Sequence, residues 1–113
     1  MVFKQGIDIV ENKRIKRLYF KYKNTFLKKI LTENEINDLK KISSQSVVIR
    51  KIISRFSAKE AAAKAIGTGF RKGLKFTDIE IRYDSFQKPK LKLRKEVFDK
   101  IFSKKKNILS SVS

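Results

Sequence analysis

Hydrophobic and polar residues alternate at the start of the chain and then change to a longer period. In "VFKQGIDIV" the odd-numbered positions 3 to 9 fall on one side of an extended segment, which predicts a strand over residues 2–10. Asp8 places a carboxylate near the end of that strand. From Asn12 an apolar stripe at helical spacing predicts a helix to about residue 30; its members are Ile15, Leu18, Tyr19, Tyr22, Phe26 and Ile30.

Two further helices are predicted in the middle of the chain. Thr32 and Glu35 stand three residues apart in "TENE", the signature of a capping box that starts a short helix. "SSQS" interrupts the pattern, and a longer helix is predicted over about residues 47–66, with Gly67 suited to a left-handed C-cap. Its expected core contacts are Ile49, Ile52, Ile53, Phe56, Ala63 and Ile66.

The last third of the sequence predicts a hairpin and a short helix. "LKFTDIEIRYD" alternates imperfectly, which indicates a bulge near Thr77, and "KLKLR" returns as a second strand after the turn "SFQKP". Apolar residues at 97–102 predict a helix, and "NILSSVS" is typical of the start of a strand. Because helices and strands are segregated, the sequence predicts an α+β fold with a small antiparallel sheet packed against helices.

Length and composition limit the class of protein and the kind of site. A chain of 113 residues with 41% hydrophobic content predicts one globular domain over residues 1–113. The sequence contains no cysteine and no histidine, so a metal ion would have to be held by oxygen atoms. Neither a membrane-span-length apolar run nor a signal-peptide core appears, and a cytoplasmic protein is expected.

The charge of the chain is strongly positive. Its 29 basic and 11 acidic residues give a formal net charge of +18, which attracts nucleic acid, phosphorylated metabolites, anionic lipid or an acidic protein. Arg14, Arg17, Lys21 and Lys28 lie roughly opposite the apolar stripe of the predicted helix and form a cationic ridge. Solvated lysine-rich faces would produce the same composition, so the charge alone does not select the partner.

Three features of the sequence suggest chemistry. They are Asp8, the pair Glu60 and Lys64, and the turn Gly67-Thr68-Gly69. Each also has an ordinary structural explanation, as a turn residue, a surface ion pair with the acid four residues before the base, and a helix cap. The glycine turn is not a P-loop, because it follows a helix and no Gly-Lys-Ser/Thr comes after it.

Taken together and in their order along the chain, the motifs are much more specific for one family than any single feature is. "GIDIVE", "ILTENEI", "RFSAKEAAAKAIGTG" and "FTDIEI…QKPKL" closely resemble the bacterial holo-acyl-carrier-protein synthases of the 4′-phosphopantetheinyl transferase superfamily, in family order from Gly6 to Ser113. The resemblance implies a 4′-phosphopantetheinyl transferase-like fold. It also implies that the 4′-phosphopantetheine arm of coenzyme A is transferred to a serine of apo-acyl-carrier protein, releasing adenosine 3′,5′-bisphosphate, in support of fatty acid biosynthesis.

The resemblance also implies roles for individual residues. Asp8 and Glu60 would hold Mg²⁺, with Mn²⁺ as an alternative ion, and Lys64 would approach the phosphates of coenzyme A. Gly67, Thr68 and Gly69 would help shape that binding site. Since the chain has no histidine, Glu60 is also the first candidate for the proton acceptor, directly or through a metal-bound water.

The implied protein partner is acidic. Acyl-carrier proteins dock on arginines of the first helix in this family; Arg14 matches that position, and Arg17 and Lys21 share its predicted face. Such a ridge would raise the association rate and orient the carrier. The resemblance further implies a homotrimer with active sites between neighbouring subunits.

The sequence departs from the family in two places. Gln87-Lys88-Pro89 stands where the family has Gly-Lys/Arg-Pro, and a differently built turn is expected because Gln tolerates positive φ less readily than Gly. Family chains also continue past the position of Ser113 through a further strand, so the resemblance implies that this strand is cut short here.

Two other functions compete with the transferase. A nucleic-acid-binding domain would use the positive charge and the interspersed Phe and Tyr residues. No zinc finger, RNP motif or KH loop is evident, however, and this hypothesis leaves Asp8, Glu60 and Lys64 unexplained. A peripheral membrane protein would use the helix at 12–30, but its apolar stripe is expected to be core. We therefore expect neither a nucleic acid nor a membrane as partner.

Overall fold

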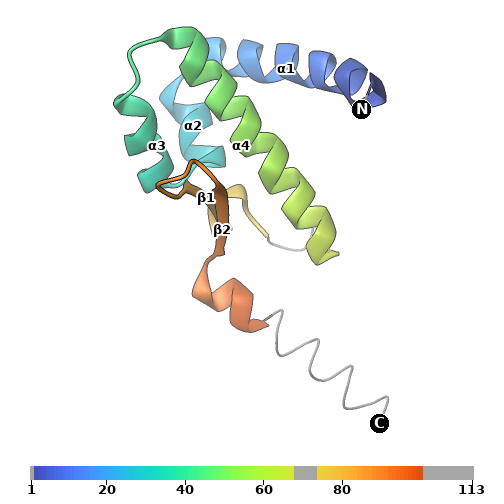
Figure 1. Ribbon diagram of the computed structural model, residues 1–113, viewed down its shortest axis with the longest axis vertical. Coiled ribbons are helices and arrows are strands. Elements are labelled where there is room, and N and C mark those ends of the chain that lie inside the picture. Colours follow the sequence, from blue (N-terminus) through green and yellow to red (C-terminus); the bar gives the residue numbers. More distant parts are fainter. Residues whose placement is uncertain (1, 68–73, 101–113) are drawn as a thin grey trace.

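The computed structural model describes residues 2–67 and 74–100, with side chains from Asn12 onward. Residues 95–100 are helical. The elements are α1 (Val2–Tyr22), α2 (Asn24–Ile30), α3 (Glu33–Lys40), α4 (Gln45–Ile66), the 3-10 turn η1 (Phe76–Asp78), β1 (Ile79–Tyr83) and β2 (Pro89–Leu93), and they are drawn in chain order in Figure 1. Helices come first and an antiparallel hairpin follows, which confirms the predicted α+β class.

The prediction of a strand over residues 2–10 is wrong. These residues form the first turns of α1, a helix of 21 residues. Phe3, Ile7 and Val10 are also spaced by four and three residues, so the apolar pattern fits one face of a helix as well as one face of a strand. Adding residues to an existing helix is also easy, because only the first turn is costly to form.

The predicted helix over residues 12–30 is interrupted at Lys23. This residue has φ 49°, outside the right-handed helical region, and α2 begins at the next position. Most of the predicted stripe is confirmed: Ile15, Phe26 and Ile30 are buried, and Leu18 and Tyr19 pack against them. Tyr22 is 48% exposed, because the break at Lys23 turns the chain just after it.

The predicted helix caps are confirmed. Thr32 Oγ1 accepts a hydrogen bond from the Glu35 N–H at 3.3 Å, and Glu35 Oε1 accepts one from the Thr32 N–H at 2.8 Å. α4 begins two residues before the predicted start, with the Ser44 hydroxyl accepting from the Val47 N–H. Gly67 ends α4 in the left-handed conformation with φ 96°.

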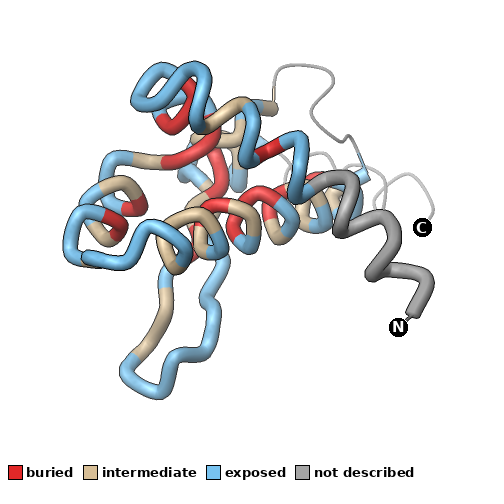
Figure 2. The backbone as a smooth tube through the Cα atoms, turned by 90° about the horizontal axis from the view of Figure 1, so that it is seen from above, coloured by how far each residue is buried: buried red, intermediate tan, exposed pale blue. Residues whose placement is uncertain are grey.

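Two apolar clusters lie along α4 and hold the fold together. The larger one joins α4 to α1, α2 and α3, and its buried members are Ile15, Phe26, Leu27, Ile30, Leu31, Leu39, Ile52 and Phe56. The smaller one joins the C-terminal half of α4 to the hairpin through Ala63, Ile79 and Ile81. Figure 2 shows the buried positions along the inner sides of the elements. α4 is therefore the element that both halves of the molecule share.

The hairpin packs against the C-terminal half of α4. Its strands are antiparallel, with Ile79 opposite Leu93 and Tyr83 opposite Pro89. The bulge predicted near Thr77 is instead the single 3-10 turn η1. Asp78 fixes this turn, because its carboxylate accepts from the Lys75 N–H at 2.9 Å and pairs with Arg94 Nε at 3.0 Å.

The hairpin turn adopts the conformation that the sequence did not favour. Gln87 has φ 62°, so it takes the left-handed backbone that glycine usually provides, and the expectation of a differently built turn is wrong in this respect. Asp84 stabilises it: its Oδ1 accepts from the Phe86 and Lys88 N–H groups, both at 2.9 Å. These bonds offset the cost of a positive φ at a residue with a Cβ atom.

Candidate active site

Glu60 and Lys64 lie on the last two turns of α4. Glu60 is half-buried and Lys64 is exposed, and their spacing places them on neighbouring turns of one helix face. The three residues between them, and Ala65 after Lys64, are alanines, which favour the helix and leave room for a ligand close to its backbone. An acid and an ammonium group thus share the end of α4 that meets the hairpin.

Gly67 ends the helix just after these two residues. Its N–H donates to the Lys64 carbonyl at 3.0 Å, and among the described residues a methyl group on its Cα would meet no atom within 4 Å beyond its chain neighbours. Within this part of the chain, the positive φ and not crowding is what favours glycine. Thr68 and Gly69, the other predicted members of this turn, lie outside the described residues.

Asp8 lies within α1 and not at the end of a strand. Its side chain is outside the described residues, so its predicted pairing with Glu60 on a metal ion stays a prediction. Figure 1 shows α1 running across the N-terminal end of α4, whereas Glu60 belongs to the last third of that helix. Among the described residues, no group of three acidic side chains is close enough to hold a metal ion.

The predicted partner-binding residues lie together on α1. Arg14, Arg17 and Lys21 are all exposed. The Arg14 guanidinium also lies 5.8 Å from the centre of the Phe56 ring, so it is held against α4.

The described part of the chain contains no helix that is both long and apolar enough to span a membrane.

A buried ionic network lies beside this site, and the sequence did not predict it. Lys59 Nζ donates to Glu35 Oε1 at 2.6 Å and to the Ile30 carbonyl at 2.7 Å, and both charged side chains are 0% exposed. Burial lowers the pKa of the Lys59 ammonium below its ordinary 10.5, while the hydrogen bond and the charge of Glu35 oppose this shift. The Ile81 N–H of β1 donates to Glu35 Oε2 at 2.9 Å.

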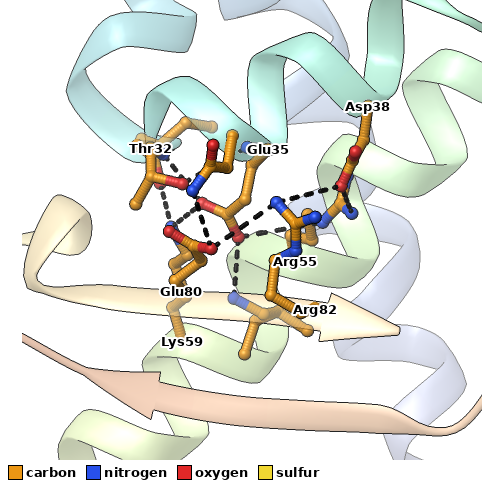
Figure 3. Close-up of polar contacts among 10 residues, drawn as sticks. Thr32, Glu35, Asp38, Arg55, Lys59, Glu80 and Arg82 are labelled. Carbon is orange, nitrogen blue, oxygen red and sulfur yellow. Dashed lines mark hydrogen bonds and ion pairs between the residues drawn. The ribbon is translucent and has the colours of Figure 1, made fainter. Parts of the chain in front are cut away.

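Arg55 extends the network to the surface. Figure 3 shows its guanidinium between Glu35 and Asp38, at 3.7 Å and 3.4 Å, and Arg82 reaches the same Asp38 oxygen at 3.8 Å. Arg55 Nε is buried without a hydrogen-bond partner among the described residues. The spacing of Ile52, Phe56, Lys59 and Ala63 is a sequence signal for the burial of Lys59, because it places this residue on the apolar face of the helix, but it does not identify the acidic partner.

Comparison with known proteins supports one family along nearly the whole chain. The family model described as the 4′-phosphopantetheinyl transferase superfamily matches residues 5–110. A holo-[acyl-carrier-protein] synthase of Ehrlichia ruminantium (strain Welgevonden) is 41% identical over 99 residues, covering 88% of this chain and 80% of its own. One from Chlamydia trachomatis (serovar L2) is 48% identical over 86 residues, covering 76% and 70%.

Solved structures are similar in fold as well. The holo-[acyl-carrier-protein] synthase of Neisseria meningitidis matches with a TM-score of 0.72 and 32% identity, covering 82% of this chain and 72% of that one. The Helicobacter pylori protein of the same name, solved in complex with coenzyme A, matches with a TM-score of 0.68 and 31% identity, covering 80% and 73%. The chain therefore shares its fold with these proteins over about four fifths of its length.

Proposed function

The chain belongs to the 4′-phosphopantetheinyl transferase superfamily, and we propose that it transfers the 4′-phosphopantetheine group of coenzyme A to a serine of apo-acyl-carrier protein. Adenosine 3′,5′-bisphosphate is the other product. The observation that carries the proposal is the block "RFSAKEAAAKAIGTG", whose residues 55–66 form the second half of α4 and place Glu60 and Lys64 on adjacent turns before the Gly67 cap.

Magnesium is the metal ion that we propose for this reaction. The chain has neither histidine nor cysteine, and the half-buried Glu60 offers the oxygen ligand that Mg²⁺ prefers, so the residues fit the ion. Asp8 and Glu60 would hold it, with Mn²⁺ as a substitute. When bound, Mg²⁺ would neutralise negative charge on the diphosphate of coenzyme A.

The chain's own residues have separate tasks in the transfer. The serine hydroxyl attacks the β-phosphorus of coenzyme A, a new P–O bond forms, and the bond to the adenosine-side phosphate breaks. Lys64 is exposed one turn beyond Glu60, where its ammonium would bind the diphosphate and oppose the charge of the leaving group. Glu60 would accept the serine proton, and Gly67, Thr68 and Gly69 would allow the diphosphate to approach the backbone.

The carrier protein would dock on α1. Arg14, Arg17 and Lys21 are exposed on one helix, and a positive surface of this kind speeds association with an acidic protein and orients it. We further propose that the chain forms a single domain and acts as a homotrimer. We place its activity in the cytoplasm, in support of fatty acid biosynthesis.

A mass measurement tests the proposal. The protein is incubated with coenzyme A, Mg²⁺ and apo-acyl-carrier protein, and the carrier is expected to gain the mass of one phosphopantetheine group. Omission of coenzyme A, or a carrier whose acceptor serine is replaced by alanine, is the control. A carrier of unchanged mass, together with tight binding of random oligonucleotides across a salt series, would favour the nucleic-acid-binding alternative.

A further inference from the structure

The C-terminal half of α4 presents a smooth surface to the hairpin. Its contacts there are made by Ala58, Ala62 and Ala63, which pack against Ile79 and Ile81. Methyl groups offer little shape for neighbouring side chains to interlock with, so they define the rotation and the axial position of a helix poorly. The first half of α4 is different, because Ile52 and Phe56 are large side chains buried among the other helices.

Lys59 lies at the junction between these two halves. Its Nζ atom bonds to the Ile30 carbonyl at the end of α2 and to Glu35 in the first turn of α3. Hydrogen bonds of 2.7 and 2.6 Å permit little displacement of the Lys59 Nζ atom. Because Lys59 and Glu35 are fully buried, water cannot take the place of either side chain. This side chain therefore fixes α4 against two other helices at a single point.

Glu35 connects the same point to the hairpin. One carboxylate oxygen accepts from Lys59 and from the Thr32 N–H, and the other accepts from the Ile81 N–H of β1. Figure 3 shows the carboxylate between α4 and the strand. Lys59 and Glu35 together therefore link α2, α3, α4 and β1 by directional hydrogen bonds.

We propose that the Lys59–Glu35 pair positions the catalytic end of α4. Lys59 directly precedes Glu60, and successive residues on a helix point about 100° apart, so holding Lys59 against Glu35 sets the direction of Glu60. Lys64, one turn further on, moves with it. Lys59 and Glu35 are positioning residues in this scheme, and the inference rests on the proposed function of Glu60.

The effect of losing the pair follows from helix geometry. A slip of α4 by one residue along its axis is about 1.5 Å, and the alanine surface would oppose a fraction of that slip only weakly. Misplacement of a reacting group by about 1 Å can reduce turnover by about 100-fold. We therefore expect loss of the pair to reduce turnover and metal affinity more than the accompanying loss of stability explains.

The experiment compares three variants with the wild-type chain. In Lys59→Met with Glu35→Gln both charges are removed, while an amide oxygen remains to accept from the backbone. Glu35→Gln alone is the second variant, which keeps Lys59, its bond to Ile30 and an amide side chain opposite the ammonium group. The control is Ile52→Val or Ile52→Ala, whichever matches the double variant in urea midpoint, since Ile52 is buried on α4 away from Glu60.

Two measurements are made at a temperature where all variants are folded by circular dichroism. One is the dissociation constant of Mn²⁺ in the presence of coenzyme A, from electron paramagnetic resonance of the free ion; the other is steady-state transfer to the carrier. For the double variant we expect weaker Mn²⁺ binding and lower kcat, each by at least about tenfold, with a smaller change of the same sign for Glu35→Gln. The Ile52 control is expected to match the wild type.

The outcomes separate the inference from the proposed function. If the wild type binds Mn²⁺ and modifies the carrier, while the double variant behaves like the Ile52 control, the positioning role is wrong and the function stands. If the double variant does not fold, Glu35→Gln decides the question by the same comparison. A wild-type chain that neither binds Mn²⁺ nor modifies the carrier would overturn both proposals.

Discussion

Replacing Lys59 with methionine would leave the buried carboxylate of Glu35 without its closest cation. Methionine is similar in length, so the change removes the charge and the two hydrogen bonds without leaving a large cavity. Glu35 would keep the Thr32 and Ile81 N–H donors, at 2.8 and 2.9 Å, and the Arg55 Nε at 3.7 Å. Glu35 is 0% exposed, so water cannot replace the lost ammonium group.

The expected loss of stability is large for a domain of this size. Breaking a buried ion pair by removing one partner costs about 3–5 kcal/mol. The remaining amide donors and Arg55 compensate in part, so we expect about 3 kcal/mol, of which about 1 kcal/mol comes from the unpaired Ile30 carbonyl. Since small domains are stable by about 5–15 kcal/mol, Lys59→Met should remove a substantial part of the total.

Urea unfolding followed by circular dichroism measures this effect in a double-mutant cycle. Lys59→Met, Glu35→Gln and the double variant are compared at pH 7, and the double variant should be about 1–2 kcal/mol more stable than Lys59→Met alone, because no buried charge is left unpaired. A loss below about 1 kcal/mol in Lys59→Met would contradict the reasoning. Additive effects of the two single changes would contradict it as well.

Four further predictions follow from the same features. Glu60→Gln and Asp8→Asn should each fold but lose most transfer activity in the carrier mass assay; near-normal turnover with Mg²⁺ would exclude the residue as a metal ligand. Arg14→Glu should raise KM for the carrier protein more than KM for coenzyme A, and equal effects on both would argue against docking on α1. Gly67→Ala should lower the free energy of unfolding by about 1 kcal/mol through strain at φ 96°, as a urea midpoint would register; an unchanged midpoint would show that the cap tolerates a side chain. Because burial lowers the pKa of Lys59 in the folded chain, the unfolded chain binds more protons between that lowered pKa and 10.5. The wild-type free energy of unfolding should therefore rise with pH across this range relative to the double variant without Lys59, and parallel pH profiles would refute the assignment.

The local signals in the sequence predicted local structure well. Thr32 and Glu35 form the expected capping box, and Gly67 forms the expected left-handed cap, because both depend on residues within one helical turn. The hairpin was also predictable from its alternation. The structure of residues 2–10 was not predictable, because their apolar positions fit both the period of a strand and that of a helix. Which of the two forms depends on the elements around them.

The buried network shows why part of the site could not be predicted. Glu35 was predicted only as a cap, yet its other oxygen and its charge are used by Ile81 and Lys59, which lie far away in the sequence. A lysine in an alanine-rich helix is normally solvated, and the spacing that marks Lys59 as core becomes meaningful only with its acidic partner identified. When a lysine and a glutamate are each considered alone in the sequence, both are expected at the surface, even where the two are buried as a pair.

The complete burial of Lys59 has a consequence for the chemical behaviour of the chain. An acylating reagent that attacks free amines would reach the exposed lysines at once, but it would reach Lys59 only when α4 separates from α2 and α3. The rate at which this one amine is acylated, read by peptide mapping, therefore reports how often the centre of the molecule opens. Labelling of Lys59 therefore measures transient opening of the core, whereas labelling of the exposed lysines measures only their accessibility at the surface.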